Sequence, residues 1–109
     1  MTADTEYHPK ISLGSLFKVL ADPHRRYTMY HLTTMDGETV DLSNLVAALS
    51  EHVATSAERL EINLRHVHLP KLVDHNLIEY DERSETIRYH DSERVEAVVE
   101  FARSEEEEL

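Results

Sequence analysis

Eight histidines are the side chains of this 109-residue sequence that most directly suggest metal chemistry. Two histidines on one helix share an ion when they lie three or four residues apart. His66 and His68 are only two apart, so they point to different faces of a helix. The remaining helical pairs are seven residues apart, about 10.5 Å: His24/His31 and His68/His75. We therefore expect structural or surface histidines, no metal and no cofactor, with a site assembled across a dimer as the open alternative.

Catalytic chemistry has little support in the residue types. The chain has no Cys, which excludes disulfides, thiolate nucleophiles and thiol-based metal sensing. With only two Gly, it has no glycine-rich phosphate loop, and it has no nucleophile motif. We expect a protein that is not an enzyme.

Basic and amide side chains in two segments are candidates for contacting nucleic acid, because such groups bind phosphates and base edges. In segment 56–75 they are Arg59, Asn63, Arg65, His66 and Lys71, and in segment 77–90 they are Arg83 and Arg88. For each Arg the alternative is a solvated surface residue paired with a nearby acid.

The net charge of −11 comes from 22 acids and 11 bases, of which only three are Lys. Many acids with few Lys indicate adaptation to a salty cytoplasm; the alternative is an acidic protein that repels nucleic acid. Segment 56–75 is neutral, with three bases and three acids, whereas 76–109 carries four bases and twelve acids. High salt damps both repulsion and counterion release, so the acidity does not exclude DNA.

An ordered series of elements must position these side chains. Apolar periodicity and turn residues predict helices over 12–20, 23–34, from Ser43 and over 56–75, extended runs over 40–42, 77–81 and 86–90, and a last helix after Asp91 or Ser92. Asp22 is the expected cap before Pro23, and Thr55 with Glu58 fits a capping box. Asn76 suits a left-handed helix end.

These elements predict a mainly α protein with a small β-hairpin wing, a winged helix-turn-helix. We expect a flexible lead over 1–10, one domain over 11–103 and an acidic, frayed tail over 104–109. Asp36-Gly37 predicts a turn. No apolar run is long enough for a membrane span and the start lacks the apolar core of a signal peptide, so we expect a cytoplasmic protein without membrane contact.

The expected long helix carries two opposed apolar stripes. At about 100° per residue, one stripe is Ile62, Leu69, Leu72 and Val73, and the other is Leu60, Leu64, Val67 and the Lys71 stem. Two stripes indicate that both sides are covered, one by the core and one by a partner. The alternative is that Pro70 kinks the helix and rotates its halves until the stripes merge.

Two motifs carry a resemblance to a known family. Residues 16–26 (LFKVLADPHRR) resemble the opening of ArsR-type winged-helix regulators, and His68-Leu69 with Asn76-Leu77-Ile78 is similar to their recognition-helix ending. The wider pattern over 12–101 more closely resembles a small haloarchaeal winged-helix family. The family's metal-sensing cysteines are absent, and the segment between Leu49 and Leu69 is longer than is typical of it.

The resemblance implies a homodimer built on the first and last helices. The expected interface residues are Leu13, Phe17, Val95, Val98, Val99 and Ala102, with packing inside one chain as the alternative. The leading hypothesis is a homodimeric regulator of transcription that binds double-stranded DNA without a thiol metal sensor. The alternative is a winged-helix module that has lost DNA binding and interacts with another protein.

Overall fold

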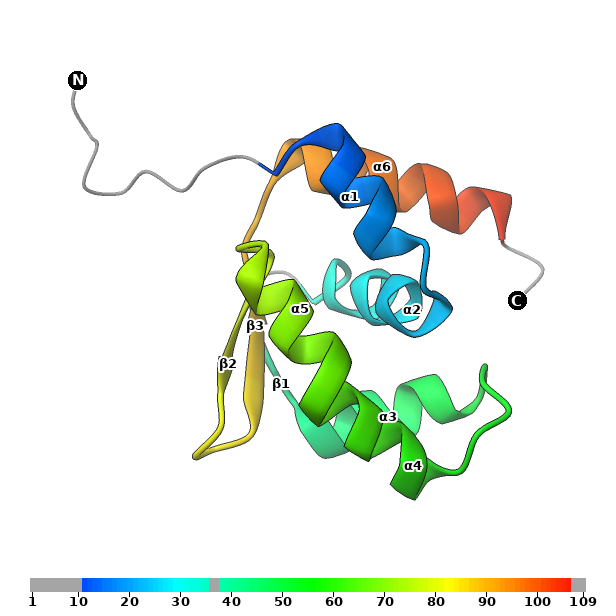
Figure 1. Ribbon diagram of the computed structural model, residues 1–109, viewed down its shortest axis with the longest axis vertical. Helices are drawn as coiled ribbons and strands as arrows, with labels where there is room; N and C mark the ends of the chain where they lie inside the picture. Colours follow the sequence, from blue (N-terminus) through cyan, green and yellow to red (C-terminus); the bar gives the residue numbers. More distant parts are fainter. Residues whose placement is uncertain (1–10, 36–37, 107–109) are drawn as a thin grey trace.

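The computed structural model describes residues 11–35 and 38–106 (Figure 1). Its α-helices are α1 (Leu13–Leu20), α2 (Pro23–Leu32), α3 (Leu42–Ser50), α4 (Ala57–Asn63), α5 (Leu69–Asp74) and α6 (Glu93–Glu105). Its strands are β1 (Thr39–Asp41), β2 (Ile78–Asp81) and β3 (Thr86–Tyr89), and a π-helical turn, η2 (Leu64–His68), joins α4 to α5. The expected lead over 1–10, the Asp36-Gly37 turn and residues 107–109 of the expected tail lie outside the described residues.

The three strands form one antiparallel sheet in the order β1-β3-β2. β2 and β3 are the predicted hairpin, with Tyr80 opposite Ile87, and Val40 of β1 lies opposite Ile87 from the other side. Val40 and Ile87 are buried, so one face of the sheet packs on the helices. With α3 and the helix α4–α5 as the helix-turn-helix and β2–β3 as the wing, the chain has the predicted winged helix-turn-helix fold.

Side-chain caps start the first two helices where the sequence predicts them. The Ser12 hydroxyl accepts the N–H of Ser15 at 3.1 Å, and Asp22 Oδ1 accepts the N–H of His24 at 2.8 Å, with Pro23 as the first residue of α2. Such caps satisfy N–H groups that have no partner within the helix.

The caps of α3 and α4 lie one or two residues away from the positions that the sequence predicts. α3 begins at Leu42 rather than after Ser43, because β1 leads directly into the helix. Leu42 still donates its N–H to the backbone carbonyl of Glu85 at 2.9 Å, as a strand residue would. α4 is capped by Ser56, whose hydroxyl accepts the N–H of Arg59, and not by Thr55. Asn76 does take the left-handed conformation that ends α5, with φ of 62°.

The predicted long helix is continuous in space but changes its hydrogen-bonding register at η2. The N–H of Leu69 reaches the carbonyl of Leu64, five residues back. One extra residue in the turn rotates the following segment by about 100°. Leu69 therefore stands where a residue four positions after Leu64 would stand in an α-helix.

This rotation merges the two apolar stripes into one. The buried side chains are Leu69 and Leu72 from one predicted stripe and Leu60 and Leu64 from the other. The leftover members, Ile62, Val67 and Val73, are exposed. The stripes do merge, as the alternative expects, but the rotation comes from the π turn that ends at His68 and not from a change at Pro70 itself. Pro70 follows two residues later, and its ring has no N–H to give to an α-helical ladder.

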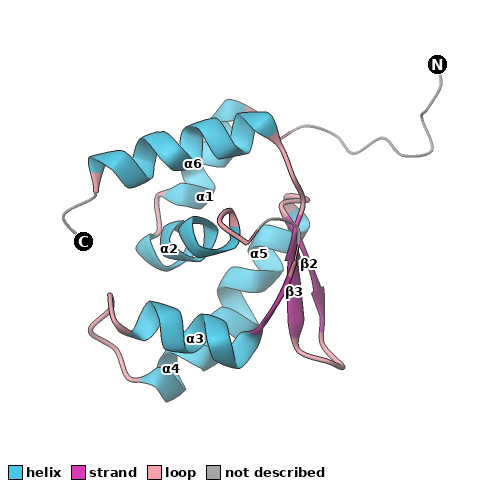
Figure 2. Cartoon of the chain, turned by 180° about the vertical axis from the view of Figure 1, so that it is seen from behind, coloured by secondary structure: helices cyan, strands magenta, loops and turns pink. Residues whose placement is uncertain are grey.

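The helices stack in layers beside the sheet. α1 and α6 both pack on α2, on the side away from α3 and α4 (Figures 1 and 2). The core between these layers is mainly aliphatic and includes Leu16, Met29, Leu45, Leu64 and Leu69. Within the described residues, no helix has the length and apolarity needed to cross a bilayer.

α6 extends beyond the expected domain end at 103 and continues to Glu105. Glu106 caps it, and its carboxylate accepts hydrogen bonds from Arg26 at 2.7 and 2.8 Å and from the Tyr30 hydroxyl at 2.5 Å. The expected frayed tail is therefore wrong for residues 104–106, because an ion pair to α2 holds this end of the chain.

Candidate nucleic-acid interface

One face of the helix α4–α5 carries most of the predicted DNA contacts. Because Leu60, Leu64, Leu69 and Leu72 turn inward, the opposite side faces solvent. Arg59, His66 and Lys71 are exposed, and Asn63 is half-buried. The structure thus places three of the five predicted helix contacts fully on the outer face.

Arg65 is occupied by two carboxylates. Its guanidinium donates to Glu61, one helical turn earlier, and to Glu85, the residue before β3, both at 2.7 Å. The hydrogen bond to Glu61, and then the one to Glu85, raise the pKa of Arg65 above its usual value. The neighbouring Tyr80 hydroxyl is buried without a hydrogen-bond partner among the described residues, and burial raises its pKa. Arg65 therefore connects the helix α4–α5 to the wing.

The wing presents mixed charge with an acidic excess. Arg83 and Arg88 are both exposed, as predicted for phosphate contacts. The turn around Arg83 also contains Asp81, Glu82 and Glu85, and Asp81 Oδ1 accepts the N–H of Arg83 at 3.0 Å. Of the two surfaces, the helix face carries the less acidic field.

The predicted dimer residues fall into two groups. Leu13 and Phe17 of α1 are exposed, Phe17 by 55 %, and Phe101 of α6 is exposed by 64 %. Phe17, Val98, Phe101 and Ala102 together line an open depression of about 360 Å³ between the two helices. Val95 and Val99 are wrong as interface residues, because both are 1 % exposed and belong to the core of the chain.

A larger cavity of about 640 Å³ opens between α2, the end of α3 and α6. Tyr27, Tyr30 and His52 give it aromatic walls, and Arg103 and Glu106 give it both signs of charge. Arg103 lies over the Tyr30 ring at 5.4 Å and donates to the Tyr30 carbonyl at 2.9 Å. These contacts join α6 to α2 on the side of the domain away from the wing.

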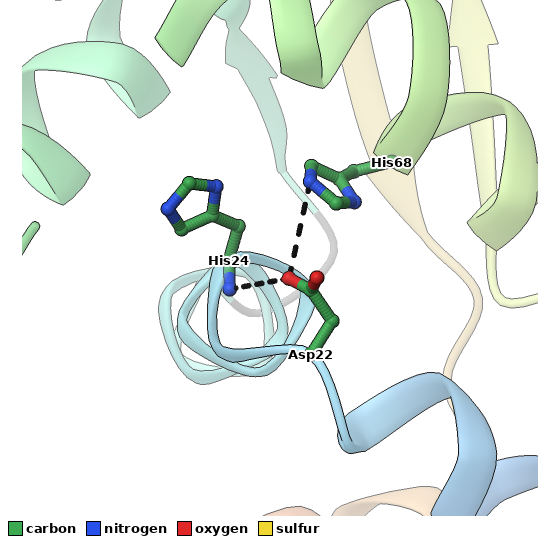
Figure 3. Close-up of side chains that lie close together, drawn as sticks. All are labelled: Asp22, His24 and His68. Atoms are coloured by element: carbon green, nitrogen blue, oxygen red, sulfur yellow. Dashed lines mark hydrogen bonds and ion pairs between the residues drawn. The ribbon is translucent and has the colours of Figure 1, made fainter. Parts of the chain in front are cut away.

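The fold also brings together three metal-ligand residue types that the sequence spacing leaves apart. Asp22 and His24 at the start of α2 approach His68 at the end of η2, and one possible ligand atom from each lies within 4.8 Å of the others (Figure 3). His68 is at least 44 residues from the other two along the chain, so no spacing rule within one helix identifies the group. Only the packing of η2 on α2 does.

Two searches for similar proteins found nothing: no curated protein and no solved structure matches the chain. One family model, described as Domain of unknown function (DUF7344), matches residues 17–88. The matched region runs from α1 through β3 and so contains the helix-turn-helix and the wing. Because the match covers more than half of the 109 residues, the chain belongs to this family.

Proposed function

We propose that the chain is a cytoplasmic, DNA-binding regulator of transcription that acts as a homodimer without a thiol metal sensor. The observation that carries the proposal is the single buried stripe of the helix α4–α5, which leaves Arg59, His66 and Lys71 exposed. A recognition helix needs such an outer face, because its residues contact base edges in the major groove. The ArsR-like motifs over 16–26 and 66–78 support the same function.

The charge distribution fits DNA binding at high salt. The acidic excess lies after Asn76, whereas segment 56–75 is neutral. In molar KCl the screening length is about 3 Å, so wing acids repel phosphate only at close range. Direct contacts from Arg59 and Lys71 then supply the affinity, since counterion release contributes little.

A second copy of the chain is the proposed partner at the α1–α6 face. Leu13 and Phe17 of α1 and Phe101 of α6 are large apolar side chains that this surface exposes to solvent. A two-fold axis through such a face pairs the same patch with itself. The two recognition helices would then address half-sites about one turn of DNA apart, about 34 Å.

The experiment is a selection of genomic DNA fragments from the encoding organism by the full chain in molar KCl. The proposal expects a small set of fragments to be retained with a common protected sequence. A matched protein with Arg59 and Lys71 replaced by Ala should retain none of them. Equal retention of all fragments by both proteins would overturn the proposal.

A protein-interaction module is the second candidate, and exposed apolar side chains on the long helix favour it. Ile62 is 52 % exposed and Val67 is 50 % exposed, although four leucines of the same helix are buried. If this surface binds a protein instead of DNA, replacing Ile62 and Val67 by Asn abolishes capture of that partner and leaves fragment retention unchanged. If Ile62 and Val67 instead lie against the major groove of DNA, the same replacement weakens fragment retention.

A further inference from the structure

The junction between α2 and the recognition helix holds a compact group of three potential metal ligands. Asp22 Oδ1 lies 3.8 Å from His68 Nε2, and the His24 and His68 rings are 5.4 Å apart in an edge-on arrangement (Figure 3). Two ligand atoms on one tetrahedral zinc ion are about 3.3 Å apart, given bonds of about 2.0 Å. The separation of Asp22 and His68 is therefore within a small side-chain adjustment of coordination distance.

The group is held in place by the fold. Asp22 Oδ1 caps α2 through the N–H of His24 at 2.8 Å and that of Arg25 at 3.4 Å, which fixes the carboxylate. His68 is 6 % exposed, so the surrounding chain holds its ring in place. Asp22 and His24 are only partly buried, so an ion and its waters can enter from their side.

Two imidazoles and one carboxylate select for a particular class of cation. Mg²⁺ and Ca²⁺ prefer all-oxygen sites, whereas imidazole nitrogen suits Zn²⁺ and its first-row neighbours. Three protein ligands leave a fourth position of a tetrahedral ion for water. We propose that Asp22, His24 and His68 bind one Zn²⁺ ion per chain and so pin the end of η2 to the start of α2.

Arg25 is the competitor for this site. Its Nη1 lies 3.3 Å from His68 Nδ1, and because a guanidinium only donates, the neutral ring carries its proton on Nε2. When Nε2 binds the ion, that proton moves to Nδ1, and Arg25 must withdraw. Its Nε keeps the 2.8 Å hydrogen bond to the Val19 carbonyl, so only the end of the side chain needs to turn.

The test titrates the untagged full chain with Zn²⁺ and with Co²⁺, whose visible spectrum reports four-coordination by nitrogen and oxygen. D22N, H24Q and H68Q should each weaken Zn²⁺ binding by about tenfold or more; D22N is informative because Asn still caps the helix. H66Q, an exposed histidine two residues from His68, is the matched control and should bind as wild type does. Loss of binding in H66Q, or wild-type affinity in the three ligand variants, would overturn the proposal.

Replacing Arg25 distinguishes a metal site from a structural cluster. R25M removes the competing donor and the positive charge, so its Zn²⁺ affinity should rise several-fold while its metal-free melting temperature falls. A cluster that only stabilises the fold predicts the fall without the gain in affinity, and that result would also contradict the proposal. Neither measurement involves DNA, so the zinc proposal and the proposed function can fail separately.

Discussion

Leu69 donates its backbone N–H to the carbonyl of Leu64, five residues earlier and not four. This hydrogen bond turns two opposed apolar stripes into one buried face. It also opens the helical ladder directly before Pro70, where an α-helix would be broken. The proposed DNA-binding surface therefore depends on a one-residue change of register inside one helix.

The π turn and Pro70 should be energetically coupled. Deleting exposed Val67 leaves Leu60, Leu64, Leu69 and Leu72 on one α-helical stripe, so the chain should still fold. Pro70 then sits in an α-helix interior, which costs about 3 kcal/mol. Urea denaturation should show this loss in the deletion variant, recovery when P70A is added, and a small effect of P70A alone.

Additive effects of the two changes would show that Pro70 and the π turn are independent. As a control, deletion of Lys71 places Leu69 and Leu72 on different faces and should abolish folding. A Lys71 deletion as stable as wild type would contradict the register account.

The order of the elements was predictable from the sequence because it rests on local chemistry. Asp22 before Pro23, Asn76 at a helix end and the alternation of the hairpin each act within a few residues. The π turn was not predictable, because α-helical and π-helical registers have the same local residues and only the packing of Leu69 against the core selects between them. The proximity of His68 to Asp22 was not predictable either, because it too depends on how distant parts of the chain pack together.

Site residues were predicted less well than elements. Residue type identifies Arg65 as a possible DNA contact, but its two carboxylate partners, Glu61 and Glu85, come from different elements. Likewise, the periodicity that predicts an apolar face on α6 does not say which of its residues the chain itself covers. Val95 and Val99 pack inward, while Phe101 faces solvent.

Glu106 should give the protein a measurable loss of stability in acid. Hydrogen bonds from Arg26, and then from Tyr30, lower the pKa of Glu106 below its ordinary value of 4.5. A lowered carboxyl pKa adds stability that is complete above pH 4.5 and disappears as the pH falls through the folded-state pKa. E106Q should lower the free energy of unfolding by about 1 kcal/mol at neutral pH. Its melting temperature should also fall less steeply than that of wild type as the pH is lowered below 4.5. The exposed neighbour E105Q is the control, and an acid limb equal to wild type in E106Q would contradict the ion pair.

Glu85 should restrain Arg65 from binding DNA. E85Q removes one of the two carboxylates on Arg65, whereas E82Q removes the same charge from the wing without an ion pair to Arg65 among the described residues. E85Q should therefore increase DNA affinity more than E82Q does, and steepen the salt dependence by about one unit of slope. Equal effects of the two variants would mean that Arg65 does not reach phosphate.

The α1–α6 face should control the oligomeric state. F17D and F101D place a charge on the exposed apolar surface, so both should sediment as folded monomers. V67D introduces the same charge at a similarly exposed residue elsewhere and should remain dimeric. A monomeric wild type, or a dimeric F17D/F101D double variant, would contradict the proposed interface.

The most direct test of the account is the affinity of the full chain for one selected genomic fragment, measured by fluorescence anisotropy in molar KCl. R59A/K71A should bind at least about tenfold more weakly than wild type, since each lost contact to a base or phosphate costs about 1 kcal/mol or more. The control R94A alters an exposed Arg of α6, outside the helix-turn-helix and the wing, and should keep wild-type affinity. Wild-type affinity in R59A/K71A would contradict the assignment of this helix face as the DNA-binding surface.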